Sequence, residues 1–99
     1  MMRITVDADA MSILAEGHAG YAPAGQDIVC AGVSAILDTL YERLMSKGCL
    51  QEDSVMGAGY AFIHAIDCDA SHWYLDYAAA GLDMIAEAYP DHVAVDVVV

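Results

Sequence analysis

Basic residues are scarce in this chain of 99 residues. Lys and Arg together number 3, against 15 Asp and Glu, so the formal net charge at pH 7 is −12 with His neutral. Such a charge repels phosphate backbones, and three cations cannot supply the counterion release on which nucleic-acid affinity depends. The composition therefore excludes a nucleic-acid-binding protein. Any partner recognised through charge is expected to be basic.

Long apolar runs are also missing. The longest uncharged segment, residues 55–66, contains two Gly, a Tyr and a His, and it falls short of the ~18 apolar residues that a spanning helix needs. Residues 1–6 lead directly to Asp7 and Asp9, which is unlike the long apolar region of a secretory signal. We therefore expect a cytoplasmic protein with no membrane association.

Cysteines are few, and their number is odd. Cys30, Cys49 and Cys68 form no Cys-x-x-Cys pair, so the sequence predicts neither a disulfide framework nor a thioredoxin-type redox pair. At least one thiol is then free, and Cys49 and Cys68 are expected to be bystanders. Cys68 and His72 have the spacing of a zinc half-site, but no second close pair completes four ligands. We expect neither a metal nor another cofactor.

Hydrophobic residues, in contrast, are abundant. They make up 59% of the chain, which separates it from disordered acidic tails, because those have few aliphatic side chains. A chain of this length is sufficient for one core. We expect a single domain over residues 1–99, with one small functional site.

The spacing of apolar residues predicts four strands and two helices. A helix between Asp27 and Gly48 has an apolar stripe of period 3.6 and suitable end residues, and Pro90 ends a second one. The strands are expected at residues 2–6, 11–15, 59–66 and 92–99, and the second helix from Asp69 or Ser71 to Tyr89. The order ββαβαβ predicts an α+β two-layer sandwich, in which the two helices pack on a mainly antiparallel sheet.

The strand at residues 59–66 is expected to be a buried middle strand. Tyr60, Phe62 and His64 alternate along it and share one face. On that face, His64 is expected to be a hydrogen-bonded core or interface residue rather than a catalytic one.

A glycine-rich segment precedes the first helix. Residues 17–26 contain Gly17, Gly20, Gly25 and a Pro, a composition that disfavours the interior of a helix or strand. We therefore predict a mobile loop. Asp27 directly follows this loop, where an Asp side chain is well suited to cap the helix.

Cys30 is the first candidate for chemistry, because it occupies the third helical position after Asp27. Free N–H groups and the positive end of the helix dipole favour a thiolate there. His18 lies in the loop between Gly17 and Gly20, and a Cys with a nearby His can perform nucleophilic acyl transfer. The residues alone leave two interpretations open, since a free Cys is also commonly a small core residue.

The stretch at residues 17–35 reads GHAGYAPAGQDIVCAGVSA. It resembles the motif of the bacterial ribosomal-processing cysteine protease family, Prp: Gly-His-Ala, a short Gly-containing loop, Gly-x-Asp-Ile-Val-Cys-Ala, and a Ser four residues after the Cys. The rest of the chain agrees in length and element order. The resemblance implies a small cytoplasmic cysteine endopeptidase, working as a homodimer. Its substrate would be the N-terminal extension of large-subunit ribosomal protein twenty-seven (bL27).

The resemblance also implies roles for individual residues. His18 matches the catalytic His and Cys30 the nucleophile. Asp27 matches the Asp of the motif, where it either orients His18 or only caps the helix. Ser34, one turn after Cys30, either supports the site or bonds back to a helix carbonyl. The glycine-rich loop is expected to close over an extended peptide.

Two alternatives remain open at this point. One is a non-catalytic protein-binding module of the same fold, and the other is a phage protease that acts on capsid or scaffold proteins. The presence of both His18 and Cys30 favours an enzyme, because a binding module needs neither. A basic ribosomal-protein segment would suit the acidic charge of the chain.

Overall fold

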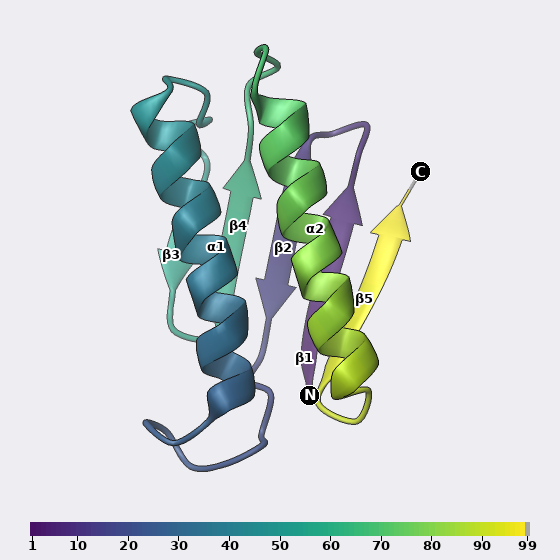
Figure 1. Cartoon of the computed structure of the whole chain (residues 1–99). Helices are drawn as coiled ribbons and strands as arrows, with labels where there is room; N and C mark the ends of the chain where they lie inside the picture. The colour runs from purple at the N-terminus through teal and green to yellow at the C-terminus, as the bar shows by residue number, and fades with distance from the viewer. Residues whose placement is uncertain (99) are drawn as a thin grey trace.

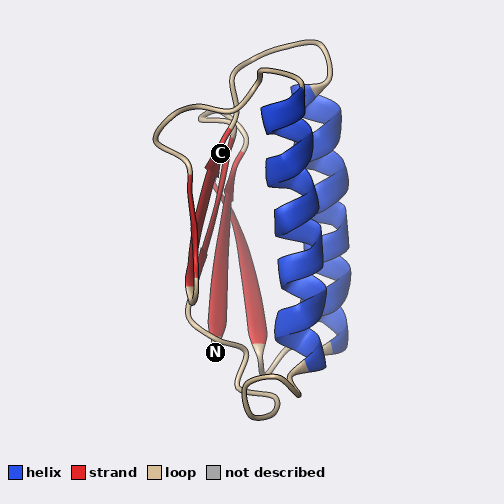
Figure 2. Cartoon of the chain, turned by 90° about the vertical axis from the view of Figure 1, so that its left-hand side faces the viewer, coloured by secondary structure: helices blue, strands red, loops and turns tan. Residues whose placement is uncertain are grey.

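A five-stranded sheet, covered on one face by two helices, forms the two layers of the computed structural model, which describes residues 1–98 (Figure 2). The strands are β1 (Met2–Asp7), β2 (Ser12–Glu16), β3 (Val55–Gly57), β4 (Tyr60–His64) and β5 (Val93–Val98); the helices are α1 (Ile28–Ser46) and α2 (Ser71–Ala88). The predicted α+β sandwich is confirmed. The predicted end of the last strand at Val99 lies outside the described residues.

The sheet has the order β3-β4-β2-β1-β5 (Figure 1). Its neighbours are antiparallel except β1 and β5, which run parallel. The predicted order ββαβαβ lacked β3, so the observed order is ββαββαβ. This edge strand has three residues and ends in Gly57, which is too short for a period-2 pattern to be visible.

The core lies between the sheet and the helices. The α1 stripe is buried as predicted, with Val29, Val33, Leu37, Leu40 and Leu44 facing the sheet. The opposing strand residues alternate along each strand and include Ile4, Ile13, Ile63 and Val93. On α2, Ala78 and Leu82 complete the contact. This packing fixes the direction of α1 and therefore the place where its first turn lies.

The prediction for β4 was correct in position but wrong in the face it buries. The strand lies between β3 and β2, as a middle strand. Ala61 and Ile63 face the helices, whereas Tyr60 is on the opposite face and 45% exposed. His64 is half-buried and its Nδ1 lies 3.0 Å from Asp53 Oδ1. The aromatic residues misled the prediction because the core face of this strand carries small and aliphatic side chains.

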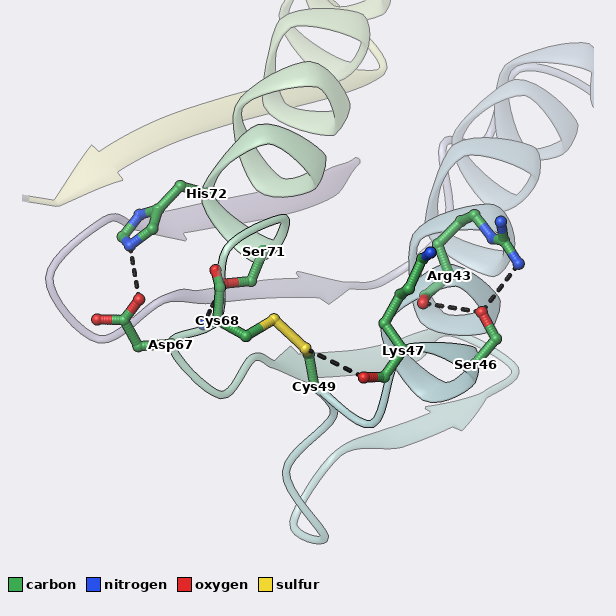
Figure 3. Close-up of a disulfide and its surroundings, with 8 residues drawn as sticks. All are labelled: Arg43, Ser46, Lys47, Cys49, Asp67, Cys68, Ser71 and His72. Atoms are coloured by element: carbon green, nitrogen blue, oxygen red, sulfur yellow. Dashed lines mark hydrogen bonds and ion pairs between the residues drawn. A yellow bond between two sulfur atoms is a disulfide. The ribbon is translucent and has the colours of Figure 1, made fainter.

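A disulfide joins Cys49 and Cys68, so the prediction that the cysteines form no disulfide was wrong (Figure 3). The bond links the residue that follows the end of α1 to the turn that precedes α2, across 19 residues of sequence. The sequence contained no sign of the pair, because the cysteines meet through a long-range pairing of the segment after α1 with the segment before α2. Leu50 bridges Ala65 there, and the Ile66 N–H donates to the Cys49 carbonyl at 2.7 Å. The Cα atoms of the two cysteines are 6.4 Å apart. Within residues 1–98, Cys30 is the one free cysteine.

None of the helices described is both long and apolar enough to cross a membrane.

Candidate active site

The candidate site lies where β2 ends, α1 begins and the β3–β4 turn closes, at the lower end of the molecule in Figure 1. A cavity of ≈ 410 Å³ opens there. His18, Cys30 and Ser34 all line it, together with Gly17 and the turn residues 57–60. The structure thus brings the predicted Cys and His to one cavity, from the loop on one side and from the helix on the other.

Cys30 is partly buried, and its sulfur has a defined partner. The backbone N–H of Ala19, in the glycine-rich loop, points at Cys30 Sγ with a donor–acceptor distance of 3.2 Å. A thiolate has no hydrogen of its own and acts only as an acceptor, so an N–H directed at the sulfur suits that form. Cys30 therefore lies in the first turn of α1, on the wall of the cavity, with a backbone N–H directed at its sulfur.

Asp27 is the N-cap residue of α1. Its Oδ1 accepts hydrogen bonds from the N–H groups of Val29 and Cys30, at 3.0 and 2.9 Å, and its Oδ2 accepts one from Tyr21 at 3.0 Å. The Cys30 N–H is the main cause that lowers the pKa of Asp27, and the Tyr21 N–H adds to it. Both carboxylate oxygens are therefore used by the backbone, and within residues 1–98 no hydrogen bond joins Asp27 to His18.

His18 is exposed and its ring lies on Gly59, in the β3–β4 turn. A Cβ at Gly59 would approach His18 Nε2 to 2.8 Å, and Gly59 has a φ of +72°. The N–H of Gly17 donates to the Gly59 carbonyl at 2.9 Å, which fixes the turn against the residue before His18. Glycine is therefore required at position 59 both for the backbone and for the imidazole. From the sequence, Gly59 was only the first residue of the strand expected at 59–66, because its contact with His18 joins segments that are distant in the chain.

Hydrogen bonds anchor the glycine-rich loop at Ala19 and Tyr21, while Gly17, Gly20 and Gly25 have φ values of +87°, +68° and +86°. These glycines set the turns of the loop, and a Cβ on Gly20 or Gly25 would meet nothing within 4 Å. The predicted mobility of this loop stays a prediction.

Histidine pairs away from the cavity are simple surface contacts. His72 Nε2 lies 2.9 Å from Asp67 Oδ1 at the start of α2, and both side chains are largely exposed (Figure 3). No group of three or more His, Cys, Asp or Glu within residues 1–98 is arranged to hold a metal ion. Cys68 belongs to the disulfide, which excludes it as a zinc ligand while that bond is intact.

The fold is shared with known crystal structures. The ribosomal processing protease Prp from S. aureus, in complex with a covalently linked product peptide, is 23% identical with a TM-score of 0.87, over 99% of this chain and 100% of that one. The same protease with a substrate peptide is 22% identical with a TM-score of 0.81, over 99% and 100%. A Streptococcus mutans protein is 23% identical with a TM-score of 0.71, over 97% and 90%. No protein with a curated description matches the chain in sequence.

A free thiol at a helix start and an imidazole on the same cavity are the features of a cysteine protease, and that is the class of this protein. The particular family follows from the sequence. The family model described as "Cysteine protease Prp" matches residues 1–94, and the chain belongs to that family.

Proposed function

We propose that this protein is an endopeptidase that uses Cys30 as nucleophile and His18 as general base and acid. The observation that carries this proposal is the shared cavity, which is lined both by His18 and by the one free cysteine of residues 1–98. No hydrogen bond joins their side chains within the described residues. Catalytic contacts of this kind are often long without substrate and tighten when it binds.

The residues of the cavity suggest how the reaction proceeds. His18 takes the thiol proton of Cys30 as Sγ attacks the scissile carbonyl carbon. The C–N bond then breaks, and His18 passes that proton to the leaving peptide nitrogen. Water, activated by His18, then hydrolyses the thioester and releases Cys30. The tetrahedral oxyanion needs N–H donors beside the sulfur. The Val29 and Cys30 N–H groups donate to Asp27, whereas the Ala19 N–H donates to the sulfur itself. Once the sulfur has bonded to carbon it is only a weak acceptor, so the Ala19 N–H is the donor that we assign to the oxyanion beside it.

The proposed substrate is the basic N-terminal extension of ribosomal protein bL27. The net charge of −12 supports a basic substrate, because a strongly acidic protein attracts and speeds the encounter with a positive segment. Asp38 on α1 lines the cavity and is exposed, so the cavity itself carries a negative charge. The S. aureus Prp structures contain substrate and product peptides, which supports a peptide as occupant.

We further propose that the protein acts in the cytoplasm as a homodimer. Ribosome assembly takes place in the cytoplasm, so the proposed substrate is found there. For the dimer, the support is an apolar groove of ≈ 810 Å³ between the outer faces of α1 and α2. Trp73, Tyr77 and Met84 on this face are 77%, 85% and 71% exposed, and a large exposed apolar patch is typical of a protein interface.

A cleavage assay tests the proposed function. The substrate is a synthetic peptide that spans the junction between the extension and mature bL27, and mass spectrometry identifies the products. We expect specific cleavage by the wild type and a loss of at least ~10³-fold in kcat/KM for Cys30→Ala and His18→Ala. The matched control is the double variant Cys49→Ala/Cys68→Ala, which should cleave at the wild-type rate.

Equal cleavage by the wild type and Cys30→Ala would refute the proposed nucleophile. Binding of the peptide without cleavage would instead identify a non-catalytic module of the same fold. Cleavage of a phage capsid or scaffold peptide, with the bL27 peptide left intact, would overturn the proposed substrate while keeping the mechanism.

A further inference from the structure

His92 makes a contact that links the far end of the chain to the glycine-rich loop. Its ring Nδ1 lies 2.9 Å from the carbonyl oxygen of Ala19, a residue 73 positions earlier in the sequence. Ala19 is 2% exposed, so its carbonyl oxygen has little access to water. Because a carbonyl only accepts hydrogen bonds, Nδ1 carries the hydrogen in this arrangement.

Ala19 has a second role at the same time. Its N–H donates to Cys30 Sγ at 3.2 Å, so the backbone of one buried residue is bonded to the proposed nucleophile on one side and to His92 on the other. Glycines with positive φ stand close on both sides of it, Gly17 at +87° and Gly20 at +68°. Since glycines leave the backbone the widest conformational freedom, Ala19 depends on its own contacts to stay in place.

His92 is itself held both by its backbone and by its ring. Its backbone N–H donates to the Tyr89 carbonyl at 3.0 Å, and its carbonyl accepts from the Met2 N–H at 2.9 Å. The ring meets Tyr21 edge-on at 5.4 Å, and Tyr21 meets Tyr89 in the same manner at 5.4 Å. The His92 side chain is therefore a fixed point on the scaffold, formed where α2 passes into β5.

We propose that His92 is a positioning residue for the peptidase reaction, which holds the Ala19 N–H against the sulfur of Cys30. It does not touch the reacting atoms and acts only through Ala19. The inference rests on the proposed role of Cys30 as nucleophile. When the Nδ1 donor is lost, the Ala19 carbonyl loses its partner and the loop is free to turn toward water. The Ala19 N–H then leaves the sulfur, and with it the donor proposed for the oxyanion.

Two substitutions separate the hydrogen bond from the packing of the ring. His92→Asn keeps a nitrogen donor on Cγ, in the place of Nδ1, but removes the ring. His92→Phe keeps a ring against Tyr21 but removes the donor. The matched control is His72→Phe, which changes an exposed His at the opposite end of α2.

The experiment measures three quantities for each variant: kcat/KM for the junction peptide, the rate of Cys30 alkylation by iodoacetamide, and hydrogen exchange of the Ala19 amide. We expect His92→Phe to lower kcat/KM and change the alkylation rate about threefold to tenfold, and to speed exchange at Ala19 by a similar factor. His92→Asn should restore most of each change, and His72→Phe should leave all three unchanged.

The proposal is overturned if His92→Asn and His92→Phe behave alike, because the donor then has no role of its own. It also fails if the ring-nitrogen NMR shifts of the folded wild type show Nδ1 of His92 without a hydrogen, a measurement that needs no variant. Alkylation and exchange require no substrate. A wild type that fails to cleave the peptide would therefore contradict the proposed function, while these two readouts still decide the link from His92 to Cys30.

Discussion

Reduction of the Cys49–Cys68 disulfide should destabilise the protein strongly while leaving the peptidase site intact. The bond closes a loop across 19 residues. In the chain-entropy model, opening a loop of this size costs about 3 kcal/mol at 25 °C, because the unfolded chain regains the freedom that the cross-link removed. Total stabilities of domains are about 5–15 kcal/mol, so this is a large share. The melting temperature is expected to fall by roughly 12–24 °C.

The active site should be insensitive to the same change, because the disulfide lies beyond the far end of α1. This helix has 19 residues and therefore spans ~28 Å at about 1.5 Å per residue. Cys30 is in its first turn, and Cys49 comes three residues after its last residue, Ser46. At 25 °C, the reduced protein that remains folded should cleave the junction peptide at the rate of the oxidised protein.

Urea unfolding, followed by circular dichroism, measures the free energy of unfolding. The comparison uses oxidised protein, protein with dithiothreitol, and the Cys49→Ala/Cys68→Ala variant, all in a Cys30→Ala background so that the free thiol cannot exchange. A difference below ~1 kcal/mol between oxidised and reduced protein would refute the stabilising role. Cleavage is measured separately on protein that retains Cys30. Loss of cleavage there on reduction, with the fold retained, would refute the independence of the two ends.

Three further predictions concern the site and the outer face of the helices. Gly59→Ala should displace the His18 ring and lower kcat/KM by ~10-fold or more, because a Cβ there would meet Nε2 at 2.8 Å; wild-type turnover in this variant would contradict the packing of His18. The pKa of Asp27 is lowered in the folded state, so its stabilising effect is present above the unfolded value of 3.8 and is lost as pH falls through the lower folded value. In urea unfolding, Asp27→Asn should lack this loss of stability at acid pH. A variant with the same pH profile of stability as the wild type would contradict the prediction. Trp73→Lys should shift sedimentation from dimer to monomer, whereas an unshifted dimer would place the interface elsewhere.

Much of the fold followed from local patterns. The α1 stripe was visible because residues three and four apart share a helix face, and Asp27 was visible as a cap because its position before the first turn is itself local. The strand β1 was predicted in the same way, because its buried and exposed residues alternate. These features depend on neighbours within a few positions, and single sequences contain that information.

The missed features depend on contacts between distant segments. His92 and Ala19 are 73 residues apart, and the Cys49–Cys68 pair lies beside a bridge between Leu50 and Ala65, which are also distant in sequence. Gly59 matters because His18 lies on it, which the turn alone does not reveal. Cys30 and His18 were identified through a family motif, since the residues by themselves left the thiol between a nucleophile and a core side chain.

The parallel pairing of β1 with β5 has a consequence for the order in which the site matures during synthesis. β1 and β2 can form their hairpin early, and α1 can then bring Cys30 into place. His92, however, directly precedes β5, and its contact with Ala19 forms only when that strand docks beside β1. A nascent chain that has not yet reached β5 therefore has the thiol and the imidazole but lacks this anchor of the loop. If His92 positions the loop as proposed, a chain whose last strand has not yet joined the sheet is expected to cleave peptide several-fold more slowly than the finished fold.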